Sequence, residues 1–323
     1  MELAGTIMGR LPGFSRPLRR LKSGFTVQEI YWRDNRAHDE AWADAESVYY
    51  GGRRSPRWQQ NYEMALVHGG TPVYPMLAPD VHVQAFPLED LRSGRWGVWC
   101  GLDHGIRHAT CCLWAAVNKE GDLHVFREYY GRDLPIKGYA AAIRQAGAPG
   151  ETVRGTVADP ACWQRTPETL KTIADLYQEA GLTITAADNV MLAGVERVTA
   201  MLVATLARWS IFHKDPGRIR EALRTPTLVE GVIHDLARHP ALTFSPACPR
   251  AFAEMVNWRY VAPTGDPRTR APAERFVDVD DEGPDVVRYL AQSPKVRWSA
   301  PRPAREGEDL VLSILEKRAR ARG

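Results

Sequence analysis

The chain has 323 residues, of which 44% are hydrophobic and 25% are charged, the balance of an ordinary soluble globular protein. A chain of this length can form one large domain or two smaller ones without disulfide support. Its longest apolar stretch, around residues 201–207, is far shorter than the ~20 residues that cross a bilayer, so no membrane association is expected. The arginines near the N-terminus precede no apolar segment or cleavage site, which excludes a secretory signal.

The cysteines and histidines exclude two common kinds of site. Five cysteines, an odd number, do not make a disulfide framework, and a reducing cytoplasm is the natural setting. Cys111 and Cys112 are adjacent and no C-x-x-C occurs, which argues against a structural zinc site. His234 and His239 are five residues apart rather than four, so the zinc-protease motif is not met.

The net charge is only +3, but it is unevenly distributed. Residues 295–323 carry eight Lys or Arg against four acidic residues, a surplus of 8 − 4 = +4, so the other residues sum to about −1. This basic tail is either a phosphate-binding arm or a solvated segment that keeps the protein soluble.

The first 90 residues are rich in arginine, glycine and aromatic residues and show weak periodicity. Short helices are expected at residues 38–49 and 55–67, and an extended, proline-rich segment at 72–87. We interpret residues 1–90 as a connector packed on a main domain at 91–294, with the basic tail at 295–323 as a third part.

The pattern sharpens after residue 95. Strands are expected at 96–103, 109–117 and 123–130, and the short turns between them predict an antiparallel meander. Asp133 followed by Pro135 predicts the start of a helix that runs to about residue 145.

The next segments alternate between strands and helices. Strands are expected at 152–158 and 182–187, with a helix from Thr166 to about residue 181 between them. Asp188 and Asn189 are expected to cap a further helix with one apolar stripe. The order predicts an α/β, ribonuclease H-like fold. Its mixed sheet of five or more strands combines the antiparallel meander with parallel strands and is flanked by helices; the first and fourth strands are parallel neighbours.

That topology predicts that two carboxylates lie close together. Asp103 ends the first strand and Asp159 ends the fourth, and neighbouring strands lie about 4.8 Å apart. Open α/β sheets bind ligands at the carboxyl ends of their strands. Mg²⁺ binds through one or two carboxylates with water and substrate phosphate, so the pair suits this ion.

A third acid is expected from the segment at 278–290. If a helix begins near Pro284, Asp285 lies in its first turn and Asp281 near the same face. The alternative is that these acids only complement the helix N-terminus.

The motifs together resemble the nuclease domain of phage large terminase subunits. GLDHG at 101–105 and the strand after it resemble the domain's opening strands, and VADP at 157–160 resembles its second acidic motif. Residues 248–260 and 281–289, which end in DVVRY, resemble its closing block. Residues 25–32 and 55–62 resemble the segment between the packaging ATPase and the nuclease. The resemblance covers roughly residues 20–292, and it lies in the order and spacing of the motifs.

The resemblance implies a two-metal endonuclease that cuts concatemeric double-stranded DNA in the host cytoplasm during phage assembly. Asp103, Asp159 and Asp285 would be the catalytic metal ligands for Mg²⁺ or Mn²⁺, with Asp281 auxiliary. Glu282 stands where family members often have His, so a fourth ligand would be a carboxylate or absent. The partners that the resemblance implies, besides DNA, are the phage portal protein and the small terminase subunit.

Two features depart from the family. Large terminases carry a phosphate loop of the type G-x-x-x-x-G-K-[ST], whereas this chain contains no Gly-Lys dipeptide. No ATP hydrolysis is therefore expected, and the chain would be a nuclease fragment or a separate nuclease polypeptide. Residues 204–232 look longer than the family usually has, and the sequence does not place them.

DNA contact is expected to be electrostatic and largely independent of base sequence. The residues expected near the phosphates are Arg107, Arg165, Lys137 and Arg132. For each of them, a solvated surface role is the alternative.

Two other functions remain open. One is another ribonuclease H-like enzyme, such as a transposase or a junction resolvase, although residues 1–90 show no helix-turn-helix signature. The other is a non-cleaving assembly module that docks on the portal and holds DNA. It predicts DNA binding without Mn²⁺-dependent nicking.

Overall fold

The computed structural model describes most of the chain between residues 32 and 299. The described residues are 32–34, 37–50, 53, 58, 62, 72–86, 91, 94–106, 108–148, 151–165, 171–225, 227–261 and 276–299, with the backbone of strands at 6–10, 17–20 and 26–27. Within them, no helix has the length and apolar character that a bilayer crossing needs.

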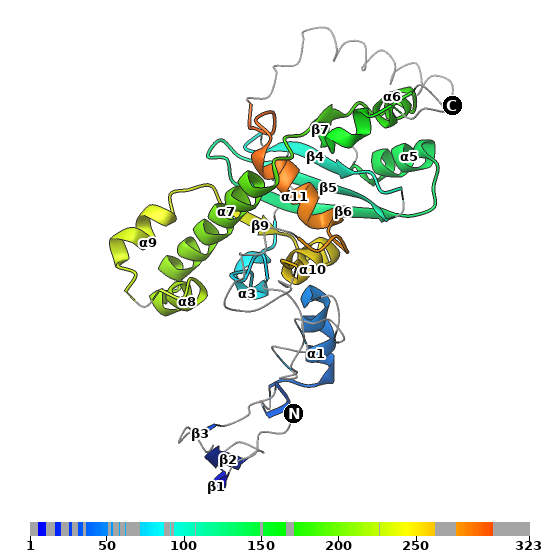
Figure 1. Cartoon of the computed structure of the whole chain (residues 1–323). Helices are drawn as coiled ribbons and strands as arrows, with labels where there is room; N and C mark the ends of the chain where they lie inside the picture. The colour runs from blue at the N-terminus through cyan, green and yellow to red at the C-terminus, as the bar shows by residue number, and fades with distance from the viewer. Residues whose placement is uncertain are drawn as a thin grey trace, which may run out of the picture.

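A six-stranded mixed sheet forms the centre of the structure (Figure 1). Its strands are β4 (Gly97–Asp103), β5 (Thr110–Val117), β6 (Leu123–Gly131), β7 (Val153–Ala158), β8 (Thr185–Ala186) and β9 (Leu242–Phe244). Their order is β8-β7-β4-β5-β6-β9. The first three strands form the antiparallel meander, and β7 is parallel to β4. The ribonuclease H-like fold class is thus confirmed. The additional strand β9, parallel to β6, was not anticipated.

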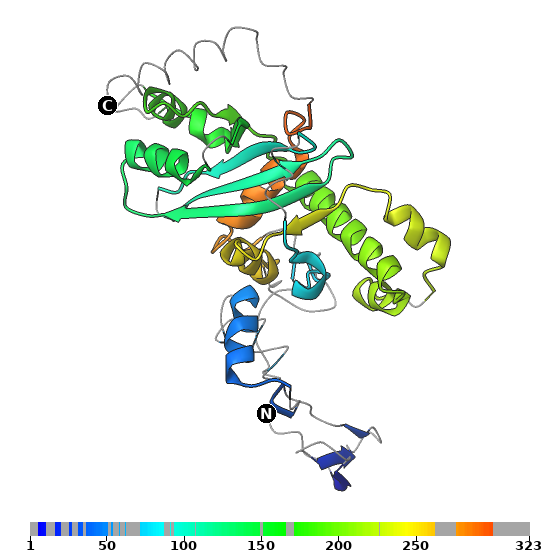
Figure 2. The ribbon, with the colours of Figure 1, turned by 180° about the vertical axis from the view of Figure 1, so that it is seen from behind.

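Helices cover both faces of the sheet (Figures 1 and 2). One face carries α5 (Ile136–Ala146) and α6 (Ile173–Glu179); the other carries α7 (Met191–Phe212), α10 (Pro249–Asn257) and α11 (Glu282–Gln292). Because side chains of a strand alternate between faces, Cys111 and Leu113 join the core under α10 and α11, while Cys112 and Trp114 join the core under α5 and α6. The meander is therefore buried on both sides.

Helix α11 lies directly against β4, and a glycine permits the approach. A Cβ built on Gly101 would stand 2.5 Å from Cγ1 of Val286 and 2.9 Å from Cγ of Leu290, closer than atoms pack. The absent side chain lets the helix approach the end of β4, two residues before Asp103. The sequence places this helix about 180 residues away from the strand, so only the fold brings them together.

Three predicted helix starts are wrong in detail. Asp133 adopts φ +58° in a turn, and α5 begins after Pro135, whose fixed φ already suits a helix start. The side chain of Asp188 accepts from the Val190 N–H (3.2 Å), and Val190 rather than an Asx residue is the N-cap of α7. The helix expected from Thr166 begins instead at Ile173. Thr172 is its N-cap and forms a capping box with Asp175. Residues 166–170 lie outside the described part.

Residues 204–232 form an arm that begins in the second half of α7. It continues through α8 (Pro216–Ala222), followed by α9 (Glu230–Leu236), and returns to the sheet as β9. Arg208 ties α7 to the start of β6 through Asp122 (2.9 Å), and the Thr205 hydroxyl donates to the Leu242 carbonyl (2.8 Å). The segment that the sequence left unplaced thus leads into the sixth strand, which follows it in the chain.

The N-terminal part includes α1 (Glu40–Ser47), which confirms the helix expected near residues 38–49. Asp39 caps it by accepting from the Trp42 N–H (2.7 Å). It is flanked by the 3₁₀ turns η1 (Trp32–Asp34) and η2 (Val48–Tyr50), and Tyr49 of η2 packs edge-on against Phe252 of α10. Further elements are α3 (Pro79–His82) and a small sheet of β1 (Thr6–Arg10), β2 (Pro17–Arg20) and β3 (Thr26–Val27).

Two sequence expectations fall largely outside the described residues. The helix expected at 55–67 is described only at residues 58 and 62, and the basic tail only as far as residue 299. All five cysteines lie in the described part, where each is buried and free, in agreement with the expectation of no disulfide framework.

Candidate functional site

Asp103 and Asp159 lie next to each other at one edge of the sheet. Leu102 of β4 is in register with Ala158 of β7, so the two aspartates follow a paired position on parallel neighbours. The Asp159 N–H also donates to the Leu102 carbonyl (3.3 Å). By the alternation of each strand, both aspartates belong to the face that carries α11. The arrangement expected from the sequence is therefore the one the fold provides.

Two donors fix the Asp159 carboxylate. Its Oδ1 accepts from the Ala161 N–H (2.8 Å), because Asp159 is the N-cap of a 3₁₀ turn, η3 (Pro160–Trp163). Its Oδ2 accepts from the hydroxyl of Tyr289 on α11 (3.2 Å). The carboxylate is thus oriented from its own strand end and from the helix that lies across it.

The first turn of α11 brings the acids of the closing block to the same place. The backbone N–H of Asp285 donates to the Asp281 carbonyl (2.9 Å), and the Asp281 side chain forms no capping hydrogen bond. The carboxylate of Asp285 pairs with Arg288, three residues along the helix (2.7 Å). Arg288 is only 1% exposed, so this is a buried ion pair rather than a surface one.

The electrostatics show that these acids share one region. The pKa of Asp103 lies well above its ordinary value, because protein packed around it disfavours its charge and because Asp285, Asp159, Asp281 and Glu282 add like charge. Burial and the nearby Asp285 raise the pKa of Asp281 to about 7. Burial also raises the pKa of Asp285, although Arg288 opposes the shift. A group of carboxylates with this charge attracts a cation.

Glu282 adds a carboxylate with an unused oxygen. The residue is 3% exposed, and its Oε1 accepts from the Ala109 N–H at the start of β5 (3.1 Å). Its Oε2 is buried and has no hydrogen-bond partner among the described residues. An unpaired buried carboxylate oxygen is costly, and it is the kind of ligand that Mg²⁺, Mn²⁺ or Ca²⁺ accepts.

The donor set suits a hard divalent cation, but it is not a closed protein cage. Among the residues that the structure describes, no group of three or more His, Cys, Asp or Glu side chains is arranged to hold an ion. Mg²⁺ ordinarily binds through one or two carboxylates and completes its shell with water and substrate phosphate. The paired aspartates at the ends of β4 and β7 fit that description.

Three of the four predicted DNA-contact residues are described, and all three are exposed. Arg132 follows β6 at the same edge as the acids, because Asp103 pairs with Cys111 and Cys111 with Tyr130. Lys137 lies in the first turn of α5, and Arg165 follows η3. The fourth residue, Arg107, lies outside the described residues.

Sequence reasoning missed how α11 serves the site with more than its acids. Arg288 and Tyr289 stand three and four residues after Asp285, so all three face the same way on a helix. Their spacing indicated that the three side chains lie on one face of the helix. Which groups each of them binds depends on the position of the helix over β4 and β7.

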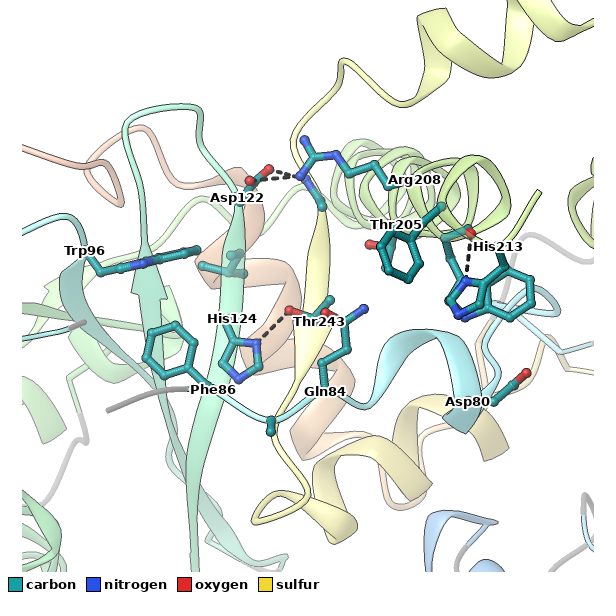
Figure 3. A pocket seen from close by; sticks show the side chains of 15 residues that line it. Asp80, Gln84, Phe86, Trp96, Asp122, His124, Thr205, Arg208, His213 and Thr243 are labelled. Atoms are coloured by element: carbon teal, nitrogen blue, oxygen red, sulfur yellow. Dashed lines mark hydrogen bonds and ion pairs between the residues drawn. The ribbon is translucent and has the colours of Figure 1, made fainter. Parts of the chain in front are cut away.

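A separate cavity of about 560 Å³ lies at the opposite edge of the sheet, where β6 begins beside β9 (Figure 3). Asp122 and Arg208 in its lining are paired with each other (2.9 Å). Nδ1 of His124 lies 2.6 Å from Oγ1 of Thr243, and the ring of Phe86 stacks on the imidazole with centroids 4.5 Å apart. Burial lowers the pKa of His124 to about 4, so the imidazole is neutral. This cavity lacks the concentration of carboxylates found at the other edge.

Comparison with known proteins gives likenesses at the level of structure. No family model matches the chain, and no curated protein sequence matches it. The large terminase of a thermophilic bacteriophage, solved with ATP-gamma-S, aligns with a TM-score of 0.45 and 13% identity over 82% of this chain and 55% of that one. The chain therefore spans about half the length of that terminase.

Two solved nuclease domains align as well. The P22 large terminase nuclease domain aligns with a TM-score of 0.44 and 12% identity over 69% of this chain and 92% of that one. The nuclease domain of the bacteriophage SPP1 large terminase, solved with bound Mn, aligns with a TM-score of 0.37 and 15% identity over 64% of this chain and 92% of that one. These three solved structures are thus a large terminase and two large terminase nuclease domains.

Proposed function

We propose that the chain is a metal-dependent endonuclease that cuts concatemeric double-stranded phage DNA during genome packaging, in the host cytoplasm. The observation that carries the proposal is the meeting of Asp103 and Asp159 at the ends of parallel β4 and β7, beneath the acids of α11. Paired carboxylates at a strand edge are suited to placing divalent cations on a phosphodiester.

Each acid has a distinct part in the proposal. Mg²⁺ or Mn²⁺, two ions when fully loaded, would supply an activated water and charge stabilisation for the leaving 3′ oxygen. Asp103 has carboxylates on both sides, from β7 and from α11, so it would be the central ligand of the set. Tyr289 keeps the Asp159 carboxylate oriented. Asp285 and Asp281 would add further carboxylates to the group around the ions. The catalytic set is therefore Asp103, Asp159 and Asp285, with Asp281 auxiliary.

Exposed cations that follow β6 and η3 or begin α5 would hold the DNA backbone. Arg132, Lys137 and Arg165, together with Arg107, would contact phosphates and give binding with little base preference. Choice of the cutting site would then come from partners, for which the portal protein and the small terminase subunit are proposed. We propose no ATP hydrolysis by this chain, and we keep residues 1–90, 91–294 and 295–323 as the proposed connector, nuclease domain and basic tail.

Supercoiled plasmid incubated with the protein and Mn²⁺ tests the proposal. Nicked and linear plasmid is expected with the unaltered protein, and Asp103→Ala should leave the plasmid supercoiled. Asp235→Asn, which removes an exposed carboxylate on α9, is the matched control and should cut normally. If the unaltered protein binds the plasmid but leaves it supercoiled at saturating Mn²⁺, a non-cleaving assembly module is the better description.

A further inference from the structure

The start of α11 carries Asp281 as its N-cap and Asp285 in its first turn, and a buried glutamate on α10 holds it in place. Glu254 is 6% exposed, and its Oε2 accepts from the backbone N–H of Gly283 (2.9 Å). That N–H lies between the two aspartates in the chain. Backbone N–H groups in the first turn of a helix have no partner within the helix, so this carboxylate supplies one.

The same carboxylate is itself fixed from two other directions. Oε2 of Glu254 also accepts from the Tyr130 hydroxyl at the end of β6 (2.8 Å), and Oε1 pairs with Nε of Arg250 (2.8 Å). The Arg250 guanidinium lies over the Tyr130 ring, 3.8 Å from its centroid. Glu254 is therefore a rigid contact point between the sheet and α11 rather than a mobile side chain.

Helix α10, which carries Glu254, is tied to the sheet as well. The carboxylate of Glu128 on β6 accepts from the backbone N–H groups of Arg250 (3.1 Å) and Ala251 (2.8 Å) in the first turn of α10. The connection thus runs from β6 through α10 to α11 by hydrogen bonds alone.

The contact at α11 is close enough to require a glycine. A Cβ built on Gly283 would stand 2.7 Å from Oε2 of Glu254 and 2.9 Å from the Tyr130 hydroxyl oxygen. Both atoms are held by other groups, so neither can move aside cheaply. On the other side of the turn, Glu282 accepts from the N–H of Ala109, the residue before β5, so the start of the helix is held at two points.

We infer that Glu254 is a positioning residue that sets where the first turn of α11 stands relative to the end of β4, and hence where Asp281 and Asp285 stand relative to Asp103. The inference rests on the proposed function, because it assigns the spacing of the proposed metal ligands to a residue that touches none of them. Hydrogen bonding and packing are the cause of this positioning.

The experiment compares Glu254→Ala, Glu254→Gln and Gly283→Ala with Glu151→Ala. Glu151 is the matched control, because it is a similarly buried carboxylate paired with an arginine, Arg127 (2.8 Å), away from α11. Four quantities are measured on the full chain: Mn²⁺ affinity by calorimetry, plasmid cleavage kinetics, thermal unfolding, and hydrogen exchange of the backbone amides of Glu282, Gly283 and Asp285.

Glu254→Ala should weaken Mn²⁺ binding and lower kcat by about tenfold or more, the usual effect of losing a residue that supports metal ligands, with KM for DNA little changed. Glu254→Gln keeps an acceptor of the same reach and should recover part of the loss. Gly283→Ala should reproduce the defect although it removes no charge. Glu151→Ala should unfold at a lower temperature yet retain metal affinity and kcat.

The outcomes separate this inference from the proposed function. If the unaltered protein neither binds Mn²⁺ nor cuts DNA, the proposed function fails and the inference fails with it. If the unaltered protein is active but Glu254→Ala matches Glu151→Ala in metal affinity, kcat and exchange at 282–285, the inference alone is overturned.

Discussion

The hydroxyl of Tyr289 donates a hydrogen bond to Oδ2 of Asp159 across 3.2 Å, and so joins α11 to the end of β7. Residues 130 positions apart in the chain thus share one contact at the acidic edge. The bond presents the carboxylate in a fixed orientation.

Tyr289→Phe should therefore lower kcat while leaving the fold intact. A hydrogen bond to a charged group contributes about 1.5–3 kcal/mol, which corresponds to a loss of roughly ten- to a hundredfold if the bond acts fully in the reaction. Plasmid cleavage kinetics with Mn²⁺ measure it. Tyr260→Phe, a partly buried tyrosine beyond α10, is the control and should cleave normally. Wild-type kcat in Tyr289→Phe would show that Asp159 needs no such orientation.

Asp103→Asn should make the metal-free protein more stable while abolishing cleavage. Burial and neighbouring carboxylates raise the pKa of Asp103, so its charged form is disfavoured in the folded state at neutral pH. A neutral amide at this position does not carry the cost of a buried carboxyl group. The substitution should therefore raise the free energy of unfolding by about 0.5–2 kcal/mol, as is common where function conflicts with stability. Urea denaturation at pH 7.5 in EDTA measures it. In Mn²⁺ the order should reverse, because only the unaltered protein gains stability from the ion.

Arg288→Met should be strongly destabilising, because it leaves the Asp285 carboxylate without its buried partner. Breaking a buried ion pair from one side costs about 3–5 kcal/mol. The double variant Arg288→Met with Asp285→Asn removes both charges and should recover much of that loss. Chemical denaturation of the two single variants and the double variant gives the coupling. If the double variant is no more stable than Arg288→Met, the pair contributes packing rather than charge compensation.

The stability of the protein should fall as the pH drops from about 6.5 toward 4, in part through His124. Burial lowers the pKa of this histidine from 6.5 to about 4, so protonation favours the unfolded chain. Its contribution is complete above about pH 6.5 and declines by up to about 3 kcal/mol at pH 4. Burial lowers the pKa of His82 as well, so that residue adds a loss of the same sign.

His124→Gln should flatten the dependence of the unfolding free energy on pH between 6.5 and 4, measured by urea denaturation at half-unit steps. His213→Gln, an exposed histidine of the same cavity, is the control and should keep the original slope. Equal slopes in the two variants would mean that His124 takes no part.

The exposed cations near the acidic edge should affect DNA binding through salt dependence. Each lost phosphate contact reduces the slope of log K against log salt by about 0.9. Arg132→Ala and Arg165→Ala should each do so, with similar losses on unrelated duplexes. Fluorescence anisotropy in Ca²⁺ measures it, with Arg238→Ala, at an exposed arginine just beyond α9, as the control. An unchanged slope would leave the tested arginine as a solvated surface group.

Much of the sheet could be predicted because its strands are locally encoded. The meander from Gly97 to Gly131 alternates or runs apolar between short turns, and Asp159 before Pro160 marks the end of β7. These local signals sufficed to place Asp103 beside Asp159.

What could not be predicted depends on contacts between distant segments. Strand β9 has three residues, too few for a hydrophobic pattern of its own. It forms because Leu242 pairs with Leu123 of β6 and its N–H donates to the Thr205 hydroxyl. The partners of Arg288 and Glu254 depend on where α11 comes to rest, which no spacing within one helix determines.

The docking of α11 against Gly101 has a consequence for the newly made chain. The acids of the proposed centre lie on three stretches, and the last of them is synthesised nearly at the end of the described region. A nascent or shortened polypeptide that lacks this helix holds only Asp103 and Asp159, without the hydroxyl that orients one of them. The order of synthesis would thus leave the acidic edge incomplete until the whole domain has been made.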